Sequence, residues 1–181
     1  MGNFFGTRSR GSLGLASRGI TDYRYDGLWL GRNEQTTIAS QQIDPTTEGG
    51  MKFTLPAGNP TEVGFSNSFV LALNLSLDLP VNLPHFLKLK PYFDIGYFDD
   101  TRPASLRSAT KTLMSGGIQW DIFGDVLSIY VPVYFSGKPL DEDPNSFKAL
   151  MSKRGGFLDR ITFSLNLKTL NPRKLIRNAV D

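Results

Sequence analysis

The sequence TKTLMSGGIQWDIFGDVLSIYVPVYF, residues Thr110–Phe135, decides the fold because it reads as one long β-hairpin. Both arms alternate between apolar and polar residues, which is typical of strands with one apolar and one wet face. The Gly124-Asp125 pair between the arms suits a tight turn, since glycine adopts positive φ without strain. One face of the hairpin is predicted to carry Thr112, Met114, Ile118, Trp120 and Ile122 from the first arm, and Leu127, Ile129, Val131, Val133 and Phe135 from the second.

The length of these arms favours a membrane-crossing sheet. Each arm contains ten or more residues. An ordinary strand has about five or six residues, whereas a strand that crosses a bilayer needs about 9–11. Within the first arm, Gly116-Gly117 interrupts the alternation and indicates a bulge or close backbone packing.

The same alternation recurs along the chain and predicts further strands. Gly64–Leu79 has leucines on one parity and mostly polar residues on the other. Other strands are predicted at Asp22–Arg32, Glu34–Ile43, Met51–Leu55, Leu87–Phe98 and Phe157–Thr169. The total is about eight antiparallel strands, with short turns at one rim and longer loops at the other. We therefore predict an all-β fold: an antiparallel up-and-down transmembrane β-barrel of about eight strands, or the C-terminal strands of a larger barrel.

Three regions are expected along the chain. Residues 1–21 are rich in Gly, Ser and Arg without periodicity, and are predicted to form an N-terminal arm or lumenal loop. Residues 22–170 contain the barrel strands, interrupted by a long polar loop at Gly137–Gly156. Residues 171–181 are predicted to form a short basic amphipathic helix, because Asn171-Pro172 suits an N-cap followed by the first helical position.

Composition excludes several classes of protein. The chain of 181 residues is 40% hydrophobic and 20% charged, which excludes a disordered chain. It has no run of about 18 apolar residues, so no transmembrane helix is expected. The net charge of +3 is scattered, so nucleic acid is not an expected partner. The absence of cysteine excludes thiolate metal sites, a cysteine nucleophile and disulfides.

The sequence contains no complete motif for a catalytic or metal-binding site. The single histidine, His85, lies in a proline-bounded turn, whereas a zinc peptidase needs two histidines one helical turn apart. Asp141, Asp143 and Asn145 resemble the start of a calcium loop, but Ser152 stands where the bidentate glutamate is needed. We therefore predict no catalytic residue, no metal site and no cofactor.

Other side chains fit a barrel wall. Four aromatic residues near strand ends are candidates for the membrane interface: Trp29, Tyr97, Trp120 and Tyr134. Charged residues on the polar parity are expected to form a cross-strand network that fills or lines the barrel: Lys88, Lys90, Asp94, Asp121 and Arg160.

From about Arg18 onward the sequence resembles the C-terminal region of large Bacteroidetes aminopeptidase-like zinc metallopeptidases. The resemblance rests on DYRYDGLWLGRNE at 22–34, SQQ at 40–42, KPYFDIGYF at 90–98, SGGI at 115–118, RITFSLNL at 160–167 and LNP at 170–172. It implies a C-terminal outer-membrane barrel, with the zinc peptidase domain upstream in a longer protein.

More loosely, the chain resembles the surface-antigen superfamily of outer-membrane assembly and translocation barrels. Arg18-Gly19 is similar to a motif on a loop that enters the lumen in that superfamily, and Phe93-Asp94-Ile95-Gly96 is similar to a strand that follows it. Ile20 stands where that superfamily has an aromatic residue.

These patterns lead to one main functional expectation. Residues 1–21 lack the apolar segment of a signal peptide, so either the chain is not exported or it is the C-terminal piece of a longer precursor, and we favour the second. The expected role is a non-catalytic anchor or module in the bacterial outer membrane, belonging to a metallopeptidase-like protein or an assembly or export complex. Its partners would be the lipid bilayer, other outer-membrane or periplasmic proteins, or an upstream domain. The alternative is a soluble β-sandwich accessory domain that binds a ligand or partner protein, since such domains show the same alternation.

Overall fold

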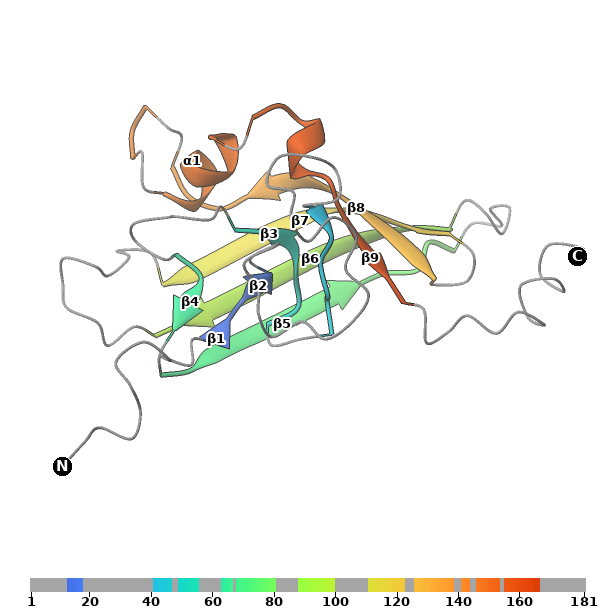
Figure 1. The fold of residues 1–181 in the computed structure, drawn as a ribbon, viewed down its shortest axis with the longest axis horizontal. Coiled ribbons are helices and arrows are strands. Elements are labelled where there is room, and N and C mark those ends of the chain that lie inside the picture. Colours follow the sequence, from blue (N-terminus) through green and yellow to red (C-terminus); the bar gives the residue numbers. More distant parts are fainter. Residues whose placement is uncertain are drawn as a thin grey trace, which may run out of the picture.

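A five-stranded antiparallel sheet, curled into a half-barrel, forms the centre of the molecule (Figure 1). The computed structural model describes residues 13–17, 41–46, 49–55, 63–66, 68–80, 88–99, 111–122, 126–138, 141–143, 146–153 and 155–166. The sheet has the order β5 (Val70–Ser76), β6 (Lys88–Phe98), β7 (Thr112–Ile122), β8 (Leu127–Phe135) and β9 (Thr162–Leu165). Mostly antiparallel strands with few helices confirm the predicted β-rich class.

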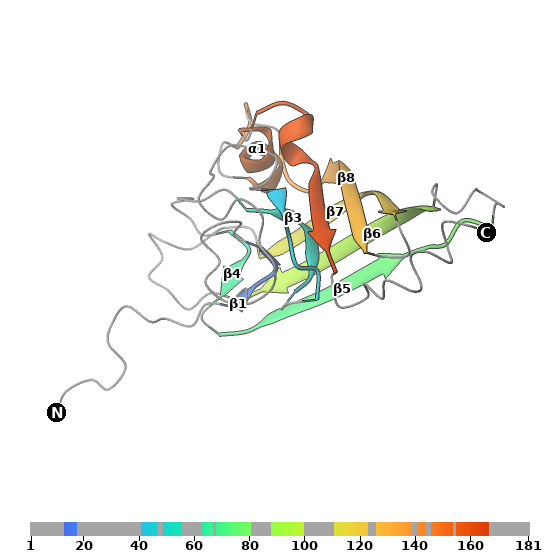
Figure 2. The ribbon, with the colours of Figure 1, turned by 45° about the vertical axis from the view of Figure 1, so that its right-hand side comes forward.

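Short strands and a helix cover one face of this sheet, which we call the inner face. β1 (Leu13–Gly14) pairs with β4 (Phe65–Ser66), and β2 (Ala16–Ser17) pairs in parallel with β3 (Met51–Thr54). α1 (Phe147–Ser152) packs beside β8, and a 3-10 turn (Leu158–Arg160) precedes β9. Figures 1 and 2 both place β3 over the sheet, with α1 beyond the β8 side.

The predicted hairpin is confirmed as β7 and β8, and its bulge lies at the predicted glycine pair. Gly117 pairs with Pro132 and Gly116 pairs with Tyr134, so Val133 is the extra residue on β8. The extra residue reverses the alternation beyond it. The prediction that Phe135 shares a face with Leu127 is therefore wrong: Phe135 points inward and is buried.

Substituting Gly117 with alanine is expected to destabilise the sheet. A Cβ at Gly117 would lie 2.2 Å from the backbone oxygen of Val131, whereas a Cβ at Gly116 would lie 3.2 Å from a Phe93 ring carbon. Overpacking of this kind costs about 1–3 kcal/mol. Urea unfolding should show such a loss for Gly117→Ala and a clearly smaller one for Gly116→Ala. Equal losses would mean that the bulge is not a site of close packing.

Four predicted elements have a different structure. The single strand expected at Gly64–Leu79 is divided into β4, which pairs with β1, and β5, which begins at Val70 in the five-stranded sheet. Met51–Leu55 was expected in the barrel wall, but β3 lies outside the five-stranded sheet, buried along its whole length. The polar loop expected at Gly137–Gly156 contains α1, whose Phe147 and Met151 are fully buried. The strand expected from Phe157 begins only at Thr162, because the preceding residues form the 3-10 turn.

The hydrophobic core lies between the inner strands and one end of the sheet. Phe53 contacts both Phe135 and Phe147, with ring centroids 6.0 and 4.8 Å apart. Leu15 packs against Gly96 of β6, where a Cβ would meet the leucine methyls at 2.7 Å. Leu15 and Ala16 of the expected N-terminal arm thus contribute to the core.

Several predictions fall outside the described residues. They are Arg18, Gly19, Trp29, the Gly124-Asp125 turn, His85, the strand at 22–32, most of the strand at 34–43, and the helix at 171–181. Within the part of the chain that the structure describes, no helix is long and apolar enough to cross a membrane.

Candidate functional site: an apolar outer face and a charged inner face

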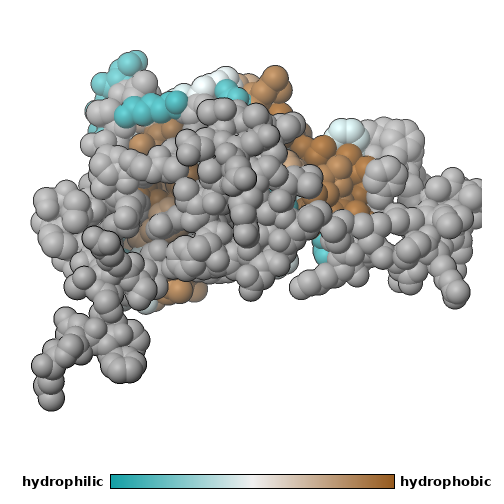
Figure 3. Space-filling model, in the orientation of Figure 1, coloured by the Kyte–Doolittle hydropathy of each residue, from teal (hydrophilic) through white to brown (hydrophobic). Residues whose placement is uncertain are grey.

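The outer face of the sheet is apolar and exposed. On and just beyond β5, the exposed fractions are 67% for Leu71, 54% for Leu73, 47% for Leu75 and 66% for Leu77. The cross-strand register continues this surface, because Leu75 lies beside Phe93 on β6. Figure 3, which views the molecule from the side of β3, shows hydrophobic residues at the surface beside β8 and a smaller patch near one end of β5. Contiguous apolar surface of this kind marks a contact with lipid or with another protein.

On β6, β7 and β8 the parity opposite this surface is buried, and it contains polar side chains as well as the apolar Phe98, Leu113 and Phe135. On β5 the polar Asn74 and Ser76 are exposed instead. On β7, Ser115 and Asp121 are almost fully buried, whereas Ile118 on the opposite face is 44% exposed. On β8, Ser128 and Tyr130 are buried between more exposed apolar neighbours. A water-soluble sheet buries its apolar face instead. In this sheet, buried polar side chains of β7 and β8 lie opposite an exposed apolar face.

An ion pair between Lys52 and Asp94 joins β3 to the sheet. The Lys52 ammonium lies 2.7 Å from Asp94 Oδ1, and the Lys52 backbone N–H donates to Oδ2 at 3.1 Å. The ammonium also lies 5.0 Å from the ring centroid of Tyr92, within cation–π range. The Thr162 hydroxyl of β9 donates to the Lys52 carbonyl at 2.9 Å. Through Lys52, β3 is therefore bonded to both β6 and β9 of the sheet.

A second charged group lies closer to the other end of the strands. Lys90 Nζ is 3.0 Å from Asp121 Oδ2 and 3.3 Å from Asp78 Oδ1. The Gln119 amide and the Ser128 hydroxyl each donate to Asp121 Oδ1 at 2.7 Å. Lys90, Gln119 and Ser128 thus compensate the buried Asp121 carboxylate, and Asp78 adds a second carboxylate beside Lys90. A charge buried in a protein requires such partners.

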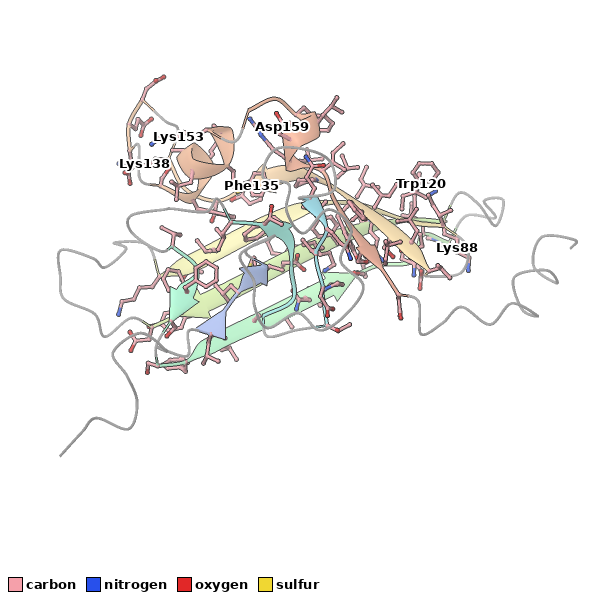
Figure 4. All side chains as sticks on the ribbon, viewed as in Figure 1. Lys88, Trp120, Phe135, Lys138, Lys153 and Asp159 are labelled. Atoms are coloured by element: carbon pink, nitrogen blue, oxygen red, sulfur yellow. The ribbon has the colours of Figure 1, made fainter. Side chains whose placement is uncertain are left out.

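The structure brings together only part of the expected cross-strand network. Lys90 and Asp121 form a pair, but Asp94 pairs with Lys52, which the sequence did not single out. Lys88 is exposed at a sheet end (Figure 4), and Arg160 lies in the 3-10 turn. In the sequence, Lys52 is only a polar residue within an alternating strand, and no local signal indicates its partner.

The described candidate interface aromatics lie on the outer parity. Tyr97 is near one end of β6 and its ring centroid is 5.8 Å from that of Phe69. Trp120 pairs with Leu89 and Ile129 toward the other end of the sheet (Figure 4). Tyr134 is 51% exposed beside the bulge. An interfacial role for these residues stays a prediction.

In the described part of the chain, charged and hydroxyl groups of different strands lie close together. Among the described residues, no group of three or more His, Asp or Glu side chains could hold a metal ion. The buried charges are engaged in pairs that join strands, which is a structural use.

No family model, no curated protein and no solved structure matches the chain.

Proposed function

We propose that this chain is a non-catalytic β-barrel module that anchors a longer protein in the bacterial outer membrane. The single observation that carries the proposal is the exposed apolar outer face of the sheet: Leu71 and Leu73 are more than half exposed, while the charged Asp94 on the opposite face of the sheet is fully buried. In a membrane barrel the outward residues contact acyl chains and the inward residues are polar.

Strand length supports the same proposal. β6 and β7 each have eleven residues and β8 has nine. A tilted strand of about 9–11 residues spans the hydrocarbon layer. In water, apolar surface costs about 25 cal/mol per Å² left exposed, so lipid would stabilise the outer face at every leucine.

The inner layer supports an anchor rather than an open pore. β3 and α1 fill the inner side of the sheet around Phe53 and Phe147. The sequence resemblance supports two kinds of anchored machinery: an upstream zinc peptidase domain, or an outer-membrane assembly or export complex. Closure of the sheet into a complete transmembrane barrel is part of this proposal.

Tryptophan quenching by lipids brominated on their acyl chains tests the proposal. The chain has two tryptophans, so Trp29→Phe leaves Trp120 as the reporter. In liposomes of brominated lipid its fluorescence is expected to fall strongly relative to unbrominated liposomes, because Trp120 lies on the outer parity.

A matched reporter uses the inner face. In Trp29→Phe/Trp120→Phe/Tyr130→Trp, the tryptophan replaces a residue only 3% exposed, and weak quenching is expected. A protein that is monodisperse without detergent, with Trp120 unquenched by brominated lipid, would overturn the membrane proposal and favour a soluble β-domain.

A further inference from the structure

Two large apolar side chains are exposed together at the turn that precedes β9. Phe157 is 55% exposed and Leu158 is 72% exposed. The residues directly before them, Gly155 and Gly156, are exposed as well. A single exposed apolar residue is ordinary on a protein surface, but adjacent ones form a contiguous apolar surface that marks a contact. We call Phe157 and Leu158 the tip.

The backbone carbonyl groups of the tip are hydrogen-bonded within the protein. The Arg160 N–H donates to the Phe157 carbonyl at 3.2 Å. The Leu158 carbonyl accepts from the Ile161 N–H at 3.2 Å and from the side-chain amide of Gln41 at 3.0 Å. Carbonyl groups paired in this way can leave water, whereas unpaired ones in hydrocarbon cost several kcal/mol each.

The shape of the turn is fixed from both sides. Gly155 has a φ of 118°, a conformation that favours glycine. The Gly156 N–H donates to Asp159 Oδ2 at 2.7 Å, which ties the start of the turn to its middle. The two apolar side chains are therefore held outward by an ordered turn.

The tip lies toward the end of the sheet that carries Tyr134. β9 runs antiparallel to β8, and its first residue, Thr162, pairs with Tyr130. The chain before Thr162 therefore lies on the side of Tyr130 toward which β8 continues, and Tyr134, 51% exposed, lies near the end of that strand. Figures 1 and 2 both place the turn next to α1 and near the end of β8.

The tip also leads directly into the outer face of the sheet. On β9, Phe163 and Leu165 are half-buried, whereas Thr162 and Ser164 are buried. Ile161, one residue before β9, is half-buried like the residues of the outer parity. The exposed apolar surface thus continues from the outer face of β9 to the tip.

We propose that the tip is an interfacial wedge that inserts into the lipid bilayer beside the end of β8, at the boundary between headgroups and acyl chains. This inference rests on the proposed function, because it takes the outer face of the sheet to be in lipid. Three observations support lipid as the occupant: continuity with the outer face, a position toward the sheet end that carries Tyr134, and a paired backbone that leaves only apolar side chains to be covered. Apolar and aromatic side chains of this kind lie at membrane interfaces.

A tryptophan placed at the tip measures its depth in the bilayer. Since the chain has two tryptophans, the variant Trp29→Phe/Trp120→Phe/Leu158→Trp has a single reporter, and Trp29→Phe/Trp120→Phe/Phe157→Trp gives a second one. Both are reconstituted in liposomes whose lipids are brominated either near the headgroup end or near the methyl end of the acyl chain. Bromine near the headgroup end is expected to lower the fluorescence about twofold, and bromine near the methyl end clearly less, because the wedge is interfacial.

A matched variant tests whether tryptophan itself draws the loop into lipid. Glu142 is exposed in the same connection between β8 and β9, and it lies between Asp141 and Asp143. In Trp29→Phe/Trp120→Phe/Glu142→Trp, brominated lipid is expected to leave the fluorescence nearly unchanged, because the neighbouring carboxylates keep this segment in water.

Three results would overturn the wedge. Equal quenching of the Glu142→Trp and Leu158→Trp reporters would mean that the added tryptophan, and not the tip, seeks the lipid. If neither tip reporter is quenched while Trp120 is quenched in Trp29→Phe, the tip lies in water and the anchor function stands. If the tip reporters are also shielded from aqueous acrylamide in that case, protein covers the tip. Loss of Trp120 quenching as well would remove the anchor function itself.

Discussion

Replacing Lys52 with methionine lowers the free energy of unfolding by about 3–5 kcal/mol, because it leaves Asp94 charged and buried without its ion-pair partner. The Asp94 side chain is fully buried, and its Oδ1 atom lies 2.7 Å from the lysine nitrogen. Equilibrium unfolding by urea in detergent micelles, followed by tryptophan fluorescence, measures the loss.

Two further variants test whether the loss of stability comes from the buried ion pair or from removing any lysine charge. Lys111→Met breaks the exposed pair with Asp99, whose atoms are 3.0 Å apart, and should cost less than about 1 kcal/mol. Lys52→Met/Asp94→Asn removes both charges and should recover most of the loss, since a neutral pair has no unpaired buried charge. Similar losses for Lys52→Met and Lys111→Met would mean that β3 is not held by this ion pair.

Replacing Leu75 with arginine destabilises the protein in liposomes by about 2–4 kcal/mol, the cost of a cation near the bilayer midplane on the lipid face of a barrel. Leu75 lies beside Phe93, the middle residue of β6, and is 47% exposed. Urea unfolding from liposomes measures the change in free energy.

Leu79→Arg is the matched variant on the same face. Leu79 lies beyond the end of β5 and is 44% exposed, similar to Leu75. Near the interface the cost of arginine falls to about 0–1 kcal/mol. A surface in water would instead accept either arginine within about 0.5 kcal/mol. Equal small losses at both positions would therefore contradict contact with lipid.

The sheet was predictable because its signal is local. Alternation with period two, long arms and the Gly116-Gly117 pair are all readable within a few residues, and they led to the β7–β8 hairpin and its bulge. The direction of the two faces was not readable, because a sandwich and a barrel share the same alternation. Arginine at Leu75 would be costly in any fold that buried this face. Because Leu75 is exposed, the cost instead depends on whether lipid or water surrounds this face.

The inner layer was not predictable because it depends on distant contacts. Met51–Leu55 has the alternation of a strand in a barrel wall. Its pairing with β2 and the Lys52–Asp94 ion pair place it instead on the inner face of the sheet. The six-residue α1 is too short to be stable alone and depends on burying Phe147. Phe135 changed face through a single extra residue, Val133, whose position depends on the partner strand.

The contacts of Lys52 also set an order for folding. Lys52 bonds to Asp94, 42 residues along the chain, and to Thr162, 110 residues along the chain. Closing loops of this length is slow, so local hairpins such as β7–β8 form earlier. Because one of its bonds needs β9, Lys52 reaches its final position only after the last strand of the sheet has been added. We therefore expect the bonds of Lys52 to be completed late in folding, and a chain shortened before Thr162 would lack the hydrogen bond from Thr162 to the Lys52 carbonyl.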